Sequence, residues 1–236
     1  MTLQHIGGLA ALICAGTYIF GFAALVTFLA GLGYGTGEID AAAVVGFTAE
    51  NPAVLLLWNT AIYIVNALAL AVLVVALAGR VRRLSEDWAN TSLAFGLIWA
   101  TLVLAAGMLA NVTTERVAAL SPRDLDAAIR SWEVLHAVEL GLGGGNEIAG
   151  GAWILCLSLA GLRHRIFGSA VLGLGLLTGL GGVLTLLPPL GDVAGVVFGL
   201  GAIGWFVAVG LSLCLGRDGA GGPPQSQPAD QGGKTP

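Results

Sequence analysis

The residues best suited to chemistry lie close together, in segment 131–151 of the 236-residue chain. This segment, SWEVLHAVELGLGGGNEIAGG, spaces Glu133, His136 and Glu139 three residues apart and places Asn146 and Glu147 after a run of glycines. At about 100° per residue, a helix puts Glu133, His136 and Glu147 in one narrow stripe, with Glu139 and Asn146 beside it. The segment therefore predicts a single helix with a continuous polar face.

Glu147 is the most informative of these residues because the sequence after it is apolar. On a helix that enters a membrane from outside, it would lie about eight residues, or roughly 12 Å, below the boundary. An ionised carboxylate inside a bilayer costs on the order of 3 kcal/mol, so Glu147 is expected to face protein or water. No Lys or Arg occurs within the long apolar runs, so the candidate partners are the amides of Asn59, Asn66 and Asn111, nearby Thr or Trp side chains, or water.

Two interpretations of this polar face stay open. In the first, a protonated Glu147 bonded to an asparagine only fastens two helices together. In the second, it binds a proton, a cation or a polar ligand in a pocket that opens outward. The candidate ligand- or ion-binding residues are Glu147, Asn146, Glu139, His136, Asn59, Asn66 and Asn111.

Catalytic and metal chemistry are not predicted. The spacing of Glu133, His136 and Glu139 would suit a metal ion, but a carboxylate-bridged di-iron bundle needs a second Glu-x-x-His on another helix. The other histidines, His5 and His164, are expected on the opposite side of the membrane. The three cysteines stand alone, and no serine or cysteine nucleophile has a matched base. We therefore predict no metal, no cofactor and no catalytic residue.

The glycines of the segment need a physical explanation. Gly143, Gly144 and Gly145 precede Asn146, and Gly150 follows shortly. Each glycine costs roughly 1 kcal/mol of helix propensity in water. Either a neighbouring helix packs against the bare backbone, or the helix is broken and its free backbone groups help to form a site.

The composition identifies the elements that must position these residues. Hydrophobic residues make up 56% of the chain and charged residues 10%, and the mean hydropathy is +0.88. A hydrocarbon core about 30 Å thick takes about 20 apolar residues per helix, and only a helix satisfies its own backbone there. We therefore predict an all-α, polytopic membrane helix bundle with six transmembrane helices, at about 6–32, 53–78, 91–110, 139–162, 166–187 and 193–215.

The positions of the cations predict the orientation. Arginines cluster after the second, fourth and sixth apolar runs, at Arg80, Arg82, Arg83, Arg163, Arg165 and Arg217. Cytoplasmic loops carry such an excess, so both the N-terminus and the C-terminus are expected in the cytoplasm. The net charge of −4 provides no basic patch for nucleic acid.

The remaining segments have simpler interpretations. Ser121 and Pro122 are typical of a helix start, and this helix either continues into the fourth span or lies at the interface. Residues 1–215 are predicted to form the transmembrane domain. Residues 216–236, rich in Gly, Pro and Gln, are predicted to be a disordered cytoplasmic tail.

Small residues at four-residue spacing indicate where helices pack closely. Gly175 and Gly179 have this spacing in the fifth run, and Gly191, Gly195 and Gly199 have it near and within the sixth. Such positions bring helix backbones together, either within the chain or at an oligomer face. Besides the lipid bilayer, the expected partners are a second copy or another membrane protein on the Gly-rich faces of these two helices.

Three stretches carry a resemblance to a known family. They are the opening MTLQHIGGLAALICAGTYIFGF, FGLIWA at 95–100 and GLGGGNEIAGGAW at 141–153. Together they resemble a bacterial membrane family catalogued as domain of unknown function 4386, over about residues 1–215. The resemblance implies a compact multi-helix protein of the bacterial plasma membrane. It implies no catalytic residue, because the family has no established activity.

Two functional hypotheses follow from the sequence. One is a small carrier or a ligand- or ion-binding protein with an outward-facing polar pocket around Glu147. The other is a structural or regulatory membrane subunit without transport or catalytic activity. The first predicts a solvent-connected cavity at Glu147, and the second predicts a filled, hydrogen-bonded interior.

Overall fold

The computed structural model describes residues 2–33, 39–144, 147–164 and 166–215. Over these residues the chain is helical, and it contains no strand. Several helices meet end to end: α3 (Pro52–Asn59), η2 (Thr60–Val65) and α4 (Asn66–Arg82) form one stretch, and η3 (Leu140–Gly144) continues α6 (Leu125–Glu139). The elements are α1 (Leu3–Val26), η1 (Ala30–Leu32), α2 (Ala41–Glu50), α3 (Pro52–Asn59), η2 (Thr60–Val65), α4 (Asn66–Arg82), α5 (Glu86–Leu120), α6 (Leu125–Glu139), η3 (Leu140–Gly144), α7 (Ile148–His164), α8 (Ser169–Leu184), η4 (Pro188–Leu190) and α9 (Gly191–Leu215).

Five helical stretches are long and apolar enough to cross a membrane: Leu3–Val26, Pro52–Arg82, Glu86–Leu120, Leu125–His164 and Pro188–Leu215. The fourth of them is broken at Gly143 and includes two residues outside the described ranges. The fifth predicted span corresponds to α8, which has only 16 residues. At 1.5 Å per residue α8 is about 24 Å long, shorter than a hydrocarbon core of about 30 Å. With these five long apolar stretches, the structure is that of an apolar, multi-pass helical membrane protein.

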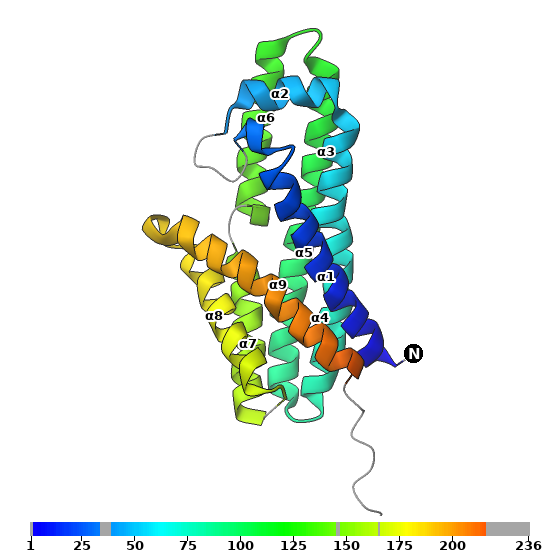
Figure 1. Ribbon diagram of the computed structural model, residues 1–236, viewed down its shortest axis with the longest axis vertical. Helices are drawn as coiled ribbons and strands as arrows, with labels where there is room; N and C mark the ends of the chain where they lie inside the picture. The colour runs from blue at the N-terminus through cyan, green and yellow to red at the C-terminus, as the bar shows by residue number, and fades with distance from the viewer. Residues whose placement is uncertain (1, 34–38, 145–146, 165, 216–236) are drawn as a thin grey trace, which may run out of the picture.

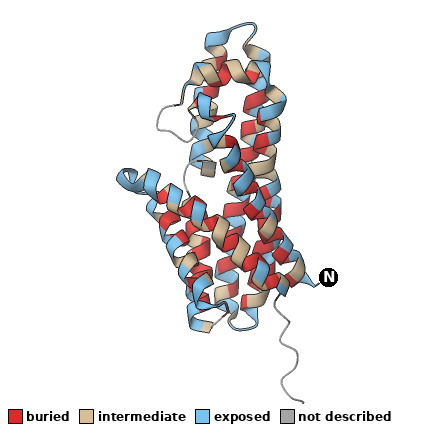
Figure 2. Cartoon of the chain, in the orientation of Figure 1, coloured by how far each residue is buried: buried red, intermediate tan, exposed pale blue. Residues whose placement is uncertain are grey.

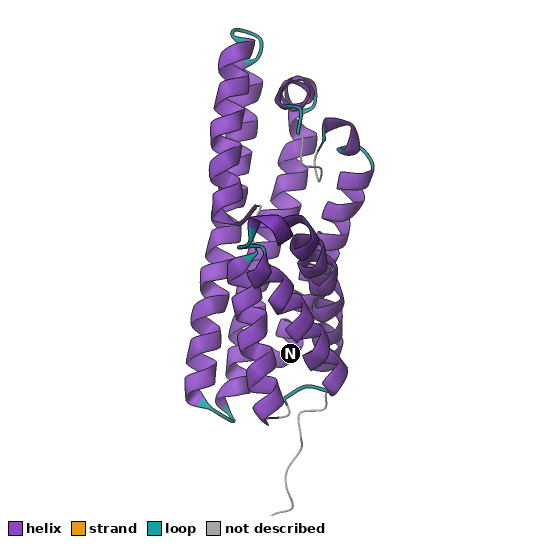
Figure 3. Cartoon of the chain, turned by 90° about the vertical axis from the view of Figure 1, so that its left-hand side faces the viewer, coloured by secondary structure: helices purple, strands orange, loops and turns teal. Residues whose placement is uncertain are grey.

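The bundle is elongated because α5 runs along most of its length (Figure 1). With 35 residues, α5 is about 52 Å long, well beyond the thickness of a hydrocarbon core. One part of the bundle consists of α4, α7, α8, α9 and the first half of α5, with α1 crossing α9 (Figure 1). The second half of α5 packs with α2, α3 and α6 and projects past the turn between α8 and α9 (Figures 1 and 3).

The interior contains two apolar clusters, one in each part of the bundle (Figure 2). In the larger cluster, Trp153, Trp205, Phe198 and Phe206 are fully buried. Trp99 stacks on Phe206 with a centroid distance of 6.1 Å and an interplanar angle of 8°. Apolar side chains also cover much of the outer surface of the bundle, as expected where helices contact lipid rather than water.

Helices α7 and α8 approach backbone to backbone. A Cβ added at Gly151 of α7 would lie 2.6 Å from the Val183 nitrogen and 2.7 Å from the Gly179 oxygen, both on α8. Gly150 likewise packs against rings, with Trp99 and Phe198 within 3 Å of such a Cβ. Close packing is therefore the reason for this glycine pair.

Several predicted boundaries differ from the helices. The first span was predicted to reach residue 32, but α1 ends at Val26 and the chain turns through η1 to Gly33, whose φ is 79°. Ser121 ends α5 instead of starting a helix. The following helix, α6, begins after Asp124, whose Oδ1 accepts a hydrogen bond from the Ala127 N–H at 2.9 Å.

The largest difference concerns the fourth span. It was predicted as one helix over 139–162, but α6 ends at Glu139 and α7 begins at Ile148. Helix α6 packs along α5 and α2 in the projecting part of the bundle. The predicted continuous polar stripe is wrong because Gly143, at φ 132° and ψ 10°, has a conformation outside any helix.

Candidate functional site

The break at η3 separates the polar residues of segment 131–151 into two groups. His136 and Glu139 remain on α6, whereas Glu147 lies immediately before α7. The Glu147 N–H donates a hydrogen bond of 3.2 Å to Thr185 Oγ1, at the C-terminal cap of α8. Glu147 is therefore at the end of the α7–α8 hairpin, not a third of the way along a continuous helix.

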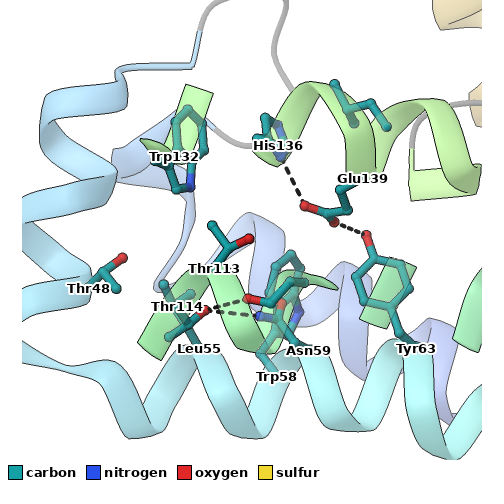
Figure 4. Close-up of a pocket in the computed structure, with 12 residues that line it drawn as sticks. Thr48, Leu55, Trp58, Asn59, Tyr63, Thr113, Thr114, Trp132, His136 and Glu139 are labelled. Carbon is teal, nitrogen blue, oxygen red and sulfur yellow. Dashed lines mark hydrogen bonds and ion pairs between the residues drawn. The ribbon is translucent and has the colours of Figure 1, made fainter. Parts of the chain in front are cut away.

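The first group lines a small cavity in the projecting part of the bundle, which we call the upper cavity (Figure 4). Its volume is about 50 Å³, enough for a few water molecules. Its lining comes from α2, α3, η2, α5, α6 and the start of η3: Thr48, Leu55, Trp58, Asn59, Tyr63, Ala110, Thr113, Thr114, Trp132, His136, Glu139 and Leu140.

A chain of hydrogen bonds crosses the upper cavity (Figure 4). The Tyr63 hydroxyl donates to Glu139 Oε1 at 2.8 Å. The other carboxylate oxygen, Oε2, lies 3.0 Å from His136 Nδ1. The His136 ring stacks on Trp132 with centroids 4.6 Å apart. Glu139 is thus fixed between an imidazole and a phenol, and its two oxygens are already engaged.

Glu147 lines a second cavity, which we call the Glu147 cavity. Its volume is about 180 Å³, smaller than the roughly 300–1,000 Å³ of pockets for drug-sized ligands. Its lining comes from α1, α3, η2, α4, α5, η3 and Glu147 itself: Thr17, Tyr18, Gly21, Phe22, Leu25, Trp58, Ile62, Tyr63, Asn66, Val103, Gly143 and Glu147. Trp58 and Tyr63 line both cavities and so form the wall between them.

The Glu147 carboxylate makes no hydrogen bond or ion pair within the described part of the chain. None of the described residues that line its cavity is Lys, Arg or His. A carboxylate in a mostly apolar cavity has lost much of its hydration, and here no protein cation compensates for that loss. When it is ionised, the Glu147 carboxylate can therefore still accept a cationic partner.

The three asparagines, which are among the candidate partners of Glu147, donate their side-chain amides to threonines instead. The side-chain amide of Asn59 donates to Thr114 at 3.4 Å. Likewise, the amide of Asn66 donates to Thr17 at 2.7 Å, and the amide of Asn111 donates to Thr60 at 3.0 Å. Each bond joins two different helices or helical segments.

The predicted site residues thus fall into four places. His136, Glu139 and Asn59 line the upper cavity, and Glu147 and Asn66 line the Glu147 cavity. Asn111 lines neither cavity. Asn146 lies outside the described residues. The break in the helix explains this division, because it turns Glu147 away from His136 and Glu139.

Sequence reasoning missed the aromatic residues of the site, chiefly Tyr63 and Tyr18. A signal for Tyr63 was present, since it lies four residues after Asn59 and three before Asn66, on the same face of one helix. Tyr18 follows Thr17 in the first apolar run and gave no comparable signal. Its position depends on the packing of α1 against α4 and α9.

The structure also shows what the glycines at four-residue spacing contact. Within the described residues, Gly175 packs against Ser158 and Trp205, Gly179 against α7, and Gly199 against Phe22. These three glycines therefore pack against other helices of the same chain. A Cβ added at Gly195 would meet nothing within 4 Å, so this part of α9 is open.

No group of three or more His, Cys, Asp or Glu residues in the described ranges is placed to hold a metal ion. No family model matches the chain, and no curated protein or solved structure matches it either. The resemblance to the domain of unknown function 4386 family stays a prediction.

Proposed function

We propose that this chain is a carrier or ligand-binding protein of the bacterial plasma membrane, with its ligand site in the Glu147 cavity. The observation that carries the proposal is a cavity of about 180 Å³ beside a carboxylate that has no hydrogen-bond or ion-pair partner among the described residues. Intramembrane or interfacial carboxylates of this kind are often functional. A broken helix next to the cavity is the arrangement that many secondary carriers use at their binding sites.

We also propose that the chain crosses the membrane six times with both ends in the cytoplasm. Helix α8 would be the additional span, paired with the 17-residue α7. The N-terminus, the α4–α5 turn, the α7–α8 connection and the end of α9 all lie at one end of the bundle (Figure 1). Arg80, Arg82 and Arg163 gather there, which supports a cytoplasmic position for that end.

In this orientation the projecting half of α5, together with α2 and α6, extends outward beyond the bilayer. Glu147 would then lie at the outer boundary, because it bonds to the cap of α8. A ligand from outside would reach the cavity near the break at Gly143. The upper cavity lies above it, on the outer side of the wall formed by Trp58 and Tyr63.

The asparagine–threonine bonds favour a second candidate function, that of a structural or regulatory subunit. Such bonds fasten helices, as the first interpretation of the sequence expects. They leave the Glu147 carboxylate and its cavity unexplained, however, and for this reason we favour ligand binding.

The test is thermal unfolding of the purified protein in mild detergent with a panel of inorganic cations, organic cations, anions and neutral solutes. At least one small solute is expected to raise the melting temperature, because a ligand that binds only the folded state stabilises it. The matched variant is Leu25→Trp. Leu25 lies half-buried on the wall of the Glu147 cavity, so the larger ring can fill the space.

The variant is expected to stay folded and to lose the solute response. An unchanged response in Leu25→Trp would place binding elsewhere. No response to any solute in the wild type would leave the structural subunit as the better account.

A further inference from the structure

We propose that the ligand of the Glu147 cavity is a small organic cation, with its ammonium group beside the Glu147 carboxylate and its carbon body against aromatic rings. This inference rests on the proposed function, since it names the chemical class of ligand for the same cavity. It stands on three observations about the described residues: a carboxylate without a partner among them, an aromatic lining and few oxygen atoms that remain to bind an ion.

The carboxylate determines the sign of the ligand's charge. Glu147 is the only charged side chain that lines the cavity within the described part of the chain. An ionised Glu147 would repel an anionic ligand, and a neutral ligand would leave the charge of that carboxylate uncompensated. A cation gains a direct attraction that strengthens as water is excluded from the space.

Aromatic residues form much of the remaining wall. Tyr18 and Phe22 come from α1, Trp58 from α3 and Tyr63 from η2, so rings from two helical stretches line the space. The face of an aromatic ring attracts an ammonium group, and quaternary ammonium ligands are commonly bound by several such rings. The lining therefore favours a cation that is itself surrounded by carbon.

The polar groups of the cavity are poor ligands for an inorganic ion. Thr17 accepts the Asn66 amide at 2.7 Å and donates its own proton to the Cys14 carbonyl at 2.8 Å. The Tyr63 hydroxyl is engaged by Glu139. A metal ion such as Ca²⁺ takes six to eight oxygen ligands. The side-chain oxygens left on the described lining are the two of Glu147, Asn66 Oδ1 and the Tyr18 hydroxyl, fewer than such an ion takes. An alkylated ammonium needs only the charge and the rings.

The experiment compares choline with 3,3-dimethyl-1-butanol, which has the same shape with carbon in place of the charged nitrogen. Binding to the purified full-length protein is measured by calorimetry and by thermal unfolding. Choline keeps its charge at every pH used, so no titration of the ligand complicates the comparison. We expect choline to bind at least about tenfold more tightly than the neutral analogue.

Three variants connect the binding to the residues. Glu147→Gln is expected to weaken choline binding by more than about tenfold and to change binding of the neutral analogue little. Phe22→Leu keeps the charge but removes one ring, and is expected to weaken choline binding by about threefold to tenfold. Glu133→Gln, the same chemical change on the exposed face of α6, is the matched control and should bind as the wild type does.

The outcomes separate the two proposals. If both compounds bind equally and Glu147→Gln changes neither, the cavity binds solutes but the cationic class is wrong. If choline does not bind while an anionic or neutral solute of the wider panel does, the class is wrong again. If no solute of any class binds the folded wild type, the proposed function fails as well. If Glu147→Gln does not fold, Phe22→Leu decides: choline binding as tight as in the wild type would overturn the aromatic part of the inference.

Discussion

Replacing Gly143 by alanine should damage the site through the backbone alone. Gly143 has φ 132° and ψ 10° and forms the break between α6 and α7. A Cβ there would find its nearest neighbour, the Leu102 Cβ, at 3.8 Å, an ordinary van der Waals distance. The added methyl group therefore fits the space, and the substitution tests only the conformation of the chain.

The expected magnitude follows from this geometry. Alanine in such a conformation costs about 1–3 kcal/mol. Gly141, two residues earlier in η3, has open space around it and no positive φ, so alanine there should gain up to about 1 kcal/mol of helix propensity. We expect Gly143→Ala to be less stable than Gly141→Ala by about 1–4 kcal/mol, the range that these two estimates span.

The assay is thermal unfolding in detergent with and without choline, for the wild type and both variants. Each kcal/mol corresponds to about 2–4 °C in a chain of this size. Alanine at residue 143 can also relax by straightening the helix, which would move Glu147 and weaken the choline response. If Gly143→Ala matched Gly141→Ala in both stability and choline response, the break would have no role in positioning Glu147.

Two further predictions concern packing and the wall of the site. Gly151→Ala should destabilise the protein by about 1–3 kcal/mol, because the three atoms nearest to the added Cβ are backbone atoms of α8. The control is Gly173→Ala, whose Cβ would lie in open space on α8. Equal melting temperatures of the two variants would contradict the backbone contact. Tyr63→Phe should lower the free energy of unfolding by about 1.5–3 kcal/mol, because the hydrogen bond to Glu139 is lost. Because the ring remains, the affinity for choline should stay within about twofold of the wild type. A much larger loss of affinity would show that the Tyr63 hydroxyl binds the ligand.

The helical membrane architecture could be predicted because apolar runs of about 20 residues permit little else. Helix ends were harder to predict. The pattern at Ser121 and Pro122 resembles a cap, yet Asp124 caps α6, since α5 continues to Leu120 before the chain turns. Such choices depend on tertiary contacts that a local pattern does not contain.

The site could be predicted only in part. Glu147 was recognised because a carboxylate beside an apolar run is costly wherever it lies. The glycines left two explanations open, and both hold: Gly143 breaks the helix, whereas Gly150 and Gly151 allow close packing. The pairing of asparagines with threonines, and the rings around the Glu147 cavity, depend on how α1 and α5 pack against the stretch from α3 to α4. No periodicity within one helix determines that packing.

The most direct measurement of the central claim is the accessibility of the Glu147 cavity to a solute from outside. In a variant with Cys14, Cys156 and Cys214 replaced by alanine, Val103→Cys places a thiol of similar size on the cavity wall. Val209→Cys, at a fully buried position away from both cavities, is the matched control. Both are treated in intact cells with a membrane-impermeant methanethiosulfonate that carries a trimethylammonium group. The account predicts rapid labelling at residue 103, slowed by choline, and no labelling at residue 209. A thiol at residue 103 that reacts only after denaturation would show a sealed interior and would contradict the account.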